Sequence, residues 1–158
     1  MHVINHYRYG RDFERDFFGK LPKFRRWVRW VEYPKAIQEC ICCQNIILWD
    51  PVHPATKMSQ AFYNSVSAGL TGSCACCGQP LELYDALGGP LDIHFGIDGF
   101  WKLGDAIVSF DLTLRAVQDK RDWRNLADVI VTSRDAEHNF ERVGPFISRI
   151  LLRRLKTA

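Results

Sequence analysis

The sequence predicts an α+β fold that is mostly helical and contains a small β element. Three observations indicate this class. Several segments place apolar residues at helical spacing, two short segments resemble strands, and all six cysteines fall in two runs that each precede a strand. A chain of 158 residues, 47% of them hydrophobic, can bury one core, so a single domain is the default expectation.

Helical spacing of apolar residues is present in six segments. We expect Gly19 and Pro22 to end the first helix, and Pro34 to stop the second, a cationic amphipathic helix. In the fourth segment, residues 110–114 also alternate like a strand, but a pattern extending over fifteen residues favours a helix. The six predicted helices cover residues 12–16, 23–32, 55–70, 103–117, 122–130 and 146–156.

The two predicted strands are residues 46–49 and residues 81–84. The prolines of residues 50–54 break the first strand, and Gly88-Gly89-Pro90 marks a boundary after the second. We therefore divide the chain into three regions. They are a basic and aromatic N-terminal helical extension (1–35), a zinc-ribbon region (36–90) that the cysteine pattern below defines, and a helical C-terminal region (91–158).

Each cysteine run, Cys40-Ile41-Cys42-Cys43 and Cys74-Ala75-Cys76-Cys77, contains a Cys-x2-Cys step. Two residues between thiolates allow a tight turn to aim both sulfurs at one ion, and Gly78 suits the end of such a turn better than Gln44. This pattern indicates a tetrahedral site for structural Zn²⁺. The expected ligands are Cys40, Cys43, Cys74 and Cys77, with Cys42, Cys76 and His53 as alternates.

Four thiolates close the coordination sphere, so such a site stabilises the fold and leaves no position for a substrate. Structural zinc contributes on the order of 10–16 kcal/mol to the folding of small domains. Paired disulfides, free buried thiols and an iron–sulfur cluster are the alternatives for the same cysteines. Thiolate ligands imply a reducing compartment.

The net charge is +3, but it is unevenly distributed: residues 1–35 and 146–158 are basic and residues 36–145 are acidic. Basic ends suggest contact with RNA, anionic lipid headgroups or acidic faces of other proteins, although solvated helix faces explain them equally well. In a nucleic-acid complex, the phosphate contacts would come from Arg25, Arg26, Arg29, Arg153 and Arg154.

Catalytic motifs have weak support in this sequence. Asp92, His94, Asp98 and Asp105 could form a second metal site or an acid–base pair, but their spacing fits no ligand motif, and surface turns are the simpler interpretation. A phosphate-binding glycine loop and a nucleophile elbow are both absent from the sequence. It also contains neither a secretory signal nor an apolar run long enough to span a bilayer.

The cysteine pattern resembles two families of respiratory-chain subunits over about a third of the chain. Cys40-Ile41-Cys42, an apolar segment with tryptophan and histidine, the 74–78 run and the 81–83 strand resemble the zinc-binding Vb-type subunit of cytochrome c oxidase. That resemblance implies zinc bound by Cys40, Cys42, Cys74 and Cys77. Cys43, His53-Pro54 and Cys74 with Cys77-Gly78 are similar to the small zinc-binding accessory subunit of complex I.

From these patterns we expect a non-catalytic structural zinc-binding accessory subunit of a large assembly. The resemblance implies a mitochondrial respiratory complex, with the protein peripheral to the inner membrane. Its partners would be other protein subunits, with anionic lipid at the basic helices. The alternative is a nucleic-acid-binding zinc ribbon of a ribosome or transcription machine.

Overall fold

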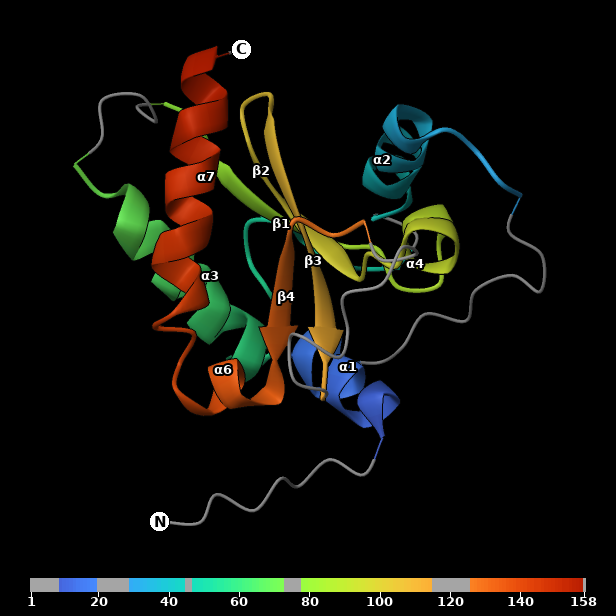
Figure 1. Ribbon diagram of the computed structural model, residues 1–158, viewed down its shortest axis with the longest axis horizontal. Helices are drawn as coiled ribbons and strands as arrows, with labels where there is room; N and C mark the ends of the chain where they lie inside the picture. The colour runs from blue at the N-terminus through green and yellow to red at the C-terminus, as the bar shows by residue number, and fades with distance from the viewer. Residues whose placement is uncertain (1–8, 20–28, 45–46, 73–77, 115–125, 158) are drawn as a thin grey trace.

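The structure is a computed structural model that describes residues 9–19, 29–44, 47–72, 78–114 and 126–157. A four-stranded sheet lies between two layers of helices, with α3 and α7 on one face and α2 and α4 on the other (Figure 1). The expected mixture of helices and strands is confirmed. The helices are α1 (Gly10–Phe18), α2 (Tyr33–Cys43), α3 (Lys57–Leu70), α4 (Pro90–Phe95), α6 (Ser133–Glu137) and α7 (Val143–Thr157). The strands are β1 (Leu81–Asp85), β2 (Gly99–Leu103), β3 (Ala106–Thr113) and β4 (Val129–Thr132).

The sheet has the strand order β1-β2-β3-β4. The first three strands form an antiparallel meander, whereas β4 runs parallel to β3. Asp85 at the end of β1 lies opposite Gly99 at the start of β2, and Gly99 lies opposite Phe110. Helix α1 lies at the edge of the sheet where β3 and β4 end (Figure 1). The end of β1, the start of β2 and the end of β3 therefore meet at one edge, near α1.

The larger hydrophobic core lies between the sheet and helices α1, α3 and α7. Phe17 of α1 packs edge-on against Phe62 of α3 at a centroid separation of 5.7 Å, and Phe62 stacks on Phe140 at 4.4 Å. Phe110 and Leu112 of β3 point into this core. Because side chains alternate along a strand, residues 109, 111 and 113 of β3 point to the opposite face.

The smaller core lies between the sheet and helices α2 and α4. Tyr84 of β1 stacks on Phe100 of β2 at 4.8 Å, and Ile37 and Leu91 bring the helices onto them. β1 and β2–β4 come from different predicted regions, 36–90 and 91–158, yet they form one sheet.

Several of the predicted helices and strands are confirmed, and others are wrong. The helices at residues 12–16, 55–70 and 146–156 are confirmed as α1, α3 and α7, and the strand at 81–84 is confirmed as β1. The strand predicted at 46–49 is wrong, because residues 47 and 48 form a turn. Trp49 still packs against β1, where its Nε1 donates to the Leu83 carbonyl at 2.8 Å.

The helix predicted at 103–117 is wrong, because residues 106–113 form β3. Of the helix predicted at 122–130, residues 129 and 130 begin β4, and residues 122–125 lie outside the described residues. The helix at 23–32 is wrong over residues 29–32, and residues 23–28 lie outside the described part. Pro34 occupies the first turn of α2 instead of ending a helix, since that position needs no N–H donor.

Candidate active site

Two aspartates, Asp98 and Asp111, lie buried at the edge of the sheet next to α1. Asp98 directly precedes β2 and is 3% exposed, whereas Asp111 is two residues from the end of β3 and is 4% exposed. The Asp98 N–H donates to the Phe110 carbonyl at 3.0 Å, and the Leu112 N–H donates to Asp98 Oδ2 at 2.8 Å. Asp98 is thus fixed to β3 through both its backbone and its carboxylate.

The carboxyl groups of Asp98 and Asp111 are hydrogen-bonded to each other. Burial raises the pKa of Asp98 well above its usual range, and the negative charges of Asp111, Asp92 and Glu14 raise it further. Every charged neighbour that contributes to this shift is acidic. The site therefore has a strongly negative potential, which a cation would relieve.

A glycine makes the close packing around Asp98 possible. A Cβ on Gly99 would lie 2.8 Å from the Tyr84 carbonyl oxygen and 2.9 Å from Cζ of Phe18. Any larger residue at position 99 would push β1 and α1 away from the start of β2. Gly99 therefore lets Phe18 of α1 pack against the start of β2, directly after Asp98.

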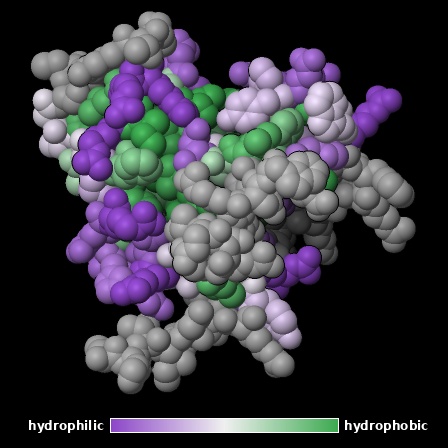
Figure 2. Space-filling view, viewed as in Figure 1, coloured by the Kyte–Doolittle hydropathy of each residue, from purple (hydrophilic) through white to green (hydrophobic). Residues whose placement is uncertain are grey.

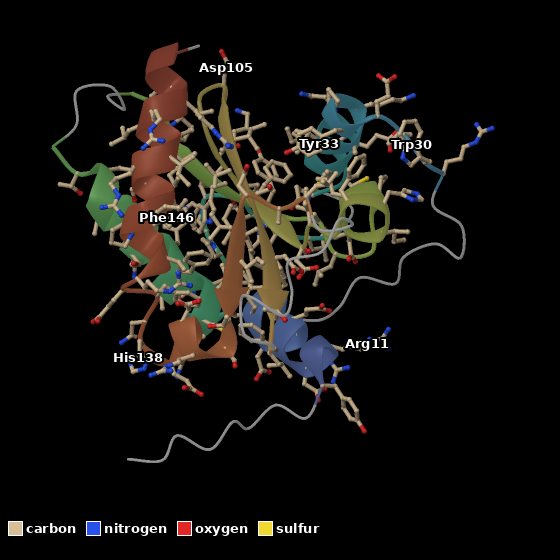
Figure 3. All side chains as sticks on the ribbon, in the orientation of Figure 1. Arg11, Trp30, Tyr33, Asp105, His138 and Phe146 are labelled. Atoms are coloured by element: carbon tan, nitrogen blue, oxygen red, sulfur yellow. The ribbon has the colours of Figure 1, made fainter. Side chains whose placement is uncertain are left out.

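Helix α1 also brings charged side chains to this edge of the sheet. Glu14 is half-buried and lies close enough to act on Asp98 and Asp85, while Arg11 and Arg15 are exposed on the same helix. Figure 3 shows Arg11 on α1 at this end, and Asp105 at the tip of the β2–β3 hairpin at the other end of the sheet. Exposed Arg134 follows β4 on α6.

A cavity of about 820 Å³ lies between α2 and the segment that joins β1 to α4. One backbone hydrogen bond links its wall to the aspartate pair, because Ala86 in the wall donates its N–H to the Asp98 carbonyl at 2.9 Å. Asp85 also lines the cavity, and burial raises its pKa to about 7, with further contributions from Asp92 and Glu14.

The predicted zinc ligands lie partly within the described residues. Cys40 and Cys43 are one turn apart in the last turn of α2, so the tight turn expected for this run is wrong. The Cys40 thiol is buried and donates to the Asp85 carbonyl at 3.2 Å, and burial raises its pKa strongly. Cys42 is exposed. Cys74, Cys76 and Cys77 lie outside the described residues, so the four-thiolate site stays a prediction.

The remaining candidate residues are dispersed. The His53 ring is exposed and pairs with Asp50 at 2.9 Å, which lowers the pKa of Asp50. Of the residues assigned to surface turns, Asp105 is in an exposed turn, but Asp98 is buried and that interpretation is wrong for it. His94 lies in α4, and Asp92 there accepts from the Gly88 N–H at 2.7 Å.

The predicted phosphate-binding arginines are also separated. Arg29 lines the cavity, while residues 25 and 26 lie outside the described residues. Arg154 forms a two-pronged ion pair with Asp128, with contacts of 2.8 and 2.9 Å, so it helps hold α7 against the sheet. In the space-filling view, hydrophilic side chains and patches of hydrophobic ones alternate over α7 (Figure 2).

Comparison of the chain with protein-family models, with curated proteins and with solved structures finds no match. Among the described residues, no helix is both long and apolar enough to cross a membrane.

Within the described part of the chain, no three His, Cys, Asp or Glu side chains converge to hold a metal by themselves. The Asp98–Asp111 pair could still hold Mg²⁺ or Mn²⁺, because Mg²⁺ keeps several waters and commonly uses one or two carboxylates together with substrate phosphates. Sequence reasoning named Asp98 but missed Asp111. The alternation of residues 110–114, which places Asp111 on the face opposite Phe110, was the signal that could have found it.

Proposed function

We propose that the protein is a divalent-cation-dependent hydrolase that cleaves phosphodiester bonds in nucleic acid. The observation that carries this proposal is the buried, mutually hydrogen-bonded pair of Asp98 and Asp111 at one edge of the sheet. Burying two carboxyl groups together costs stability. Such a pair is therefore expected where a cation or a reaction requires it. A protein that only needed a folded sheet would gain from apolar residues at these positions.

In this proposal, Asp98 and Asp111 would hold one Mg²⁺ or Mn²⁺ ion through their carboxylates. The bound ion supplies Lewis acidity toward the phosphate and lowers the pKa of a bound water. Hydrolysis joins the water oxygen to phosphorus, breaks one phosphorus–oxygen ester bond and returns a proton to the leaving oxygen. The fixed hydrogen bonds of Asp98 keep its carboxylate in place during these changes.

Phosphate is the substrate group favoured by the surroundings. The pair alone would repel an anion, but a bound divalent cation reverses this potential. Arg11 and Arg15 on α1 and Arg134 on α6 are exposed near the same edge and suit contacts to neighbouring phosphates. A polymeric, polyanionic substrate is therefore a better fit than a small neutral one.

The experiment is a cleavage assay on labelled single-stranded and double-stranded DNA and RNA, with Mg²⁺ or Mn²⁺ and with EDTA. We expect cation-dependent cleavage that Asp98→Asn and Asp111→Asn each reduce by more than about 100-fold. Asp105→Asn is the matched control, because Asp105 is exposed at the far end of the same hairpin. Cleavage that survives both substitutions, or no cleavage of any of these substrates, would reject the hydrolase.

A zinc-binding accessory subunit is the second candidate, and it rests on a different observation. Cys40 and Cys43 lie one helical turn apart at the end of α2, at spacing that allows both to reach one ion. With Cys74 and Cys77 they would form a zinc ribbon that ties α2 to the segment before β1. Such a site would stabilise a subunit of the assembly proposed from the sequence. That assembly is a mitochondrial respiratory complex or, as the alternative, a ribosome or transcription machine.

Elemental analysis of protein purified without added metal tests the zinc site. One zinc per chain, lost in both Cys43→Ser and Cys77→Ser, is the expected result, and loss of zinc in Cys42→Ser would assign a ligand role to this alternate cysteine. A metal-free wild-type protein of unchanged protease resistance would contradict it. Co-purification of other protein subunits with the zinc-loaded chain would favour the accessory role. Retention on an RNA column would favour the nucleic-acid-binding zinc ribbon.

A further inference from the structure

The cavity that Asp85 and Ala86 line has the features of a site for one nucleotide. It lies between α2 and the segment from Asp85 to Leu91, and at about 820 Å³ it is large enough for a nucleoside monophosphate. Its inner wall is largely apolar, with Ala86, Leu87 and Leu91 buried among the residues that line it. A flat heterocycle suits this volume and lining.

The mouth of the cavity carries a complementary set of side chains. Trp30, which is 64% exposed, lies there with the exposed cations Arg29 and Lys35, and Glu39 is the acidic residue on the same rim. Figure 3 shows Trp30 pointing outward next to the start of α2. An exposed indole offers a surface on which a base can stack, and the two cations suit a phosphate.

The inner end of the cavity offers a group that can read the edge of a base. Asp85 is 5% exposed and one of its oxygens, Oδ1, accepts from the Leu87 N–H at 3.0 Å. The residue also lines the cavity. A carboxyl group in this position can exchange hydrogen bonds with the ring nitrogens or amino group of a base.

We infer that this cavity binds one nucleotide of a single-stranded nucleic acid, with its base stacked on Trp30 and its phosphate held by Arg29 and Lys35. This inference rests on the proposed hydrolase activity, because it assigns a binding position to the nucleotide next to the phosphate that is cleaved. The wall residue Ala86 donates its N–H to the Asp98 carbonyl, so one backbone hydrogen bond joins the cavity wall to the residue that carries one of the two carboxyl groups. The enzyme would therefore need an unpaired nucleotide next to the bond it cleaves.

The test measures binding of nucleoside 5′-monophosphates to the full chain in EDTA, by calorimetry and by tryptophan fluorescence. We expect saturable binding that weakens at least about tenfold in Trp30→Ala and in Lys35→Ala. Lys57→Ala is the control, because Lys57 is an exposed lysine at the start of α3, away from the cavity. Asp98→Asn should bind nucleotide normally while losing cleavage, which separates the cavity from the aspartate pair.

Three results would overturn the inference. Equal competition by inorganic phosphate would mean an anion site without base recognition. Binding to phosphatidylglycerol vesicles that nucleotide does not compete would assign the cavity to a lipid headgroup. Cleavage in the absence of any nucleotide binding would reject the cavity's role and leave the hydrolase intact. Nucleotide binding without cleavage would reject the hydrolase alone.

Discussion

The side chain of Gln44 pairs with the backbone of Asp85 in the way that a neighbouring strand would. Its Nε2 donates to the Asp85 carbonyl at 2.9 Å, and its Oε1 accepts from the Asp85 N–H at 3.2 Å. The same Nε2 also donates to the Cys40 carbonyl at 2.8 Å. Gln44 thus joins the end of α2 to the end of β1 and fixes the position of Asp85 at the edge of the candidate site.

Replacing Gln44 by alanine should lower the free energy of unfolding by about 2 kcal/mol, because the buried Asp85 N–H loses the side chain it donates to and the Asp85 carbonyl keeps only the weaker Cys40 thiol donor. Water entering the adjacent cavity would offset part of the loss. Urea unfolding followed by circular dichroism measures the change. Gln38→Ala is the matched control, since Gln38 is exposed on the same helix and should leave stability within about 0.5 kcal/mol. Equal midpoints for both variants would contradict the role of Gln44.

The sequence predicted the helices whose apolar stripe alone decides their structure. α3 and α7 each bury one stripe, and a 3.6-residue period over three or four turns is a strong local signal. β3 has a weaker local signal, because strand pairing depends on residues far away in the chain. Its buried residues Val108, Phe110 and Leu112 are also compatible with a helix, and only pairing with β2 and β4 decides between the two.

The candidate site was harder to predict than the fold. Asp98 and Asp111 are thirteen positions apart, and their contact depends on the hairpin that places both at one edge of the sheet. Helix α1 packs closely on this edge of the sheet, because Gly99 leaves room for Phe18. Neither fact has a local signature in the sequence. The sequence places Gln44 at the end of a cysteine turn. In the structure Gln44 follows α2, and its side chain pairs with the backbone of Asp85 at the end of β1.

Replacing Asp98 by asparagine should stabilise the protein when no divalent cation is present. The Asp98→Asn side chain can still accept the Leu112 N–H, and it replaces a carboxyl group whose ionised form burial and Asp111 both disfavour. We expect the free energy of unfolding of Asp98→Asn in EDTA to exceed that of wild type by about 1–2 kcal/mol, because active-site residues are often kept for activity at a cost in stability. Thermal unfolding with and without Mn²⁺ measures it, and Mn²⁺ should raise the Tm of wild type but not of the variant. A destabilised variant with no difference in Mn²⁺ response would indicate a purely structural role.

The pH dependence of stability should carry the signature of Asp85. Burial raises its pKa from 3.8 to about 7 in the folded state, so between these pH values the folded protein holds a proton that the unfolded chain has released. This stability is fully present below pH 3.8, declines as the pH rises toward about 7, and is absent above it. Asp85→Asn removes this titration.

The free energy of unfolding of Asp85→Asn, relative to wild type, should therefore rise by a few kcal/mol from pH 4 to pH 7 and then level off. The asparagine oxygen can still accept from the Leu87 N–H, so little change is expected at pH 4. Urea unfolding at half-unit pH steps gives the curve. A difference between variant and wild type that stays constant over this range would contradict the raised pKa.

The contact between α3 and α7 depends on the absence of a side chain at Gly144. A Cβ there would lie 2.6 Å from Ser65 Cβ and 3.0 Å from the Ser65 carbonyl carbon, and neither atom can move without shifting α3. The Ser65 hydroxyl also donates to the Phe140 carbonyl at 2.9 Å across the same contact. Gly144→Ala should therefore destabilise the protein by about 1–3 kcal/mol through overpacking.

Gly10→Ala is the matched control for Gly144→Ala, because Gly10 begins α1 and a Cβ there would meet nothing within 4 Å. It should be neutral or stabilising by up to about 1 kcal/mol, since alanine favours helix more than glycine does. Thermal unfolding of Gly144→Ala, Gly10→Ala, Ser65→Gly and the double variant that combines Ser65→Gly with Gly144→Ala completes the test. The double variant should be more stable than the sum of its single changes predicts, because removing the Ser65 Cβ makes room for the new methyl group. Strict additivity would mean that the two helices are not in the close contact described.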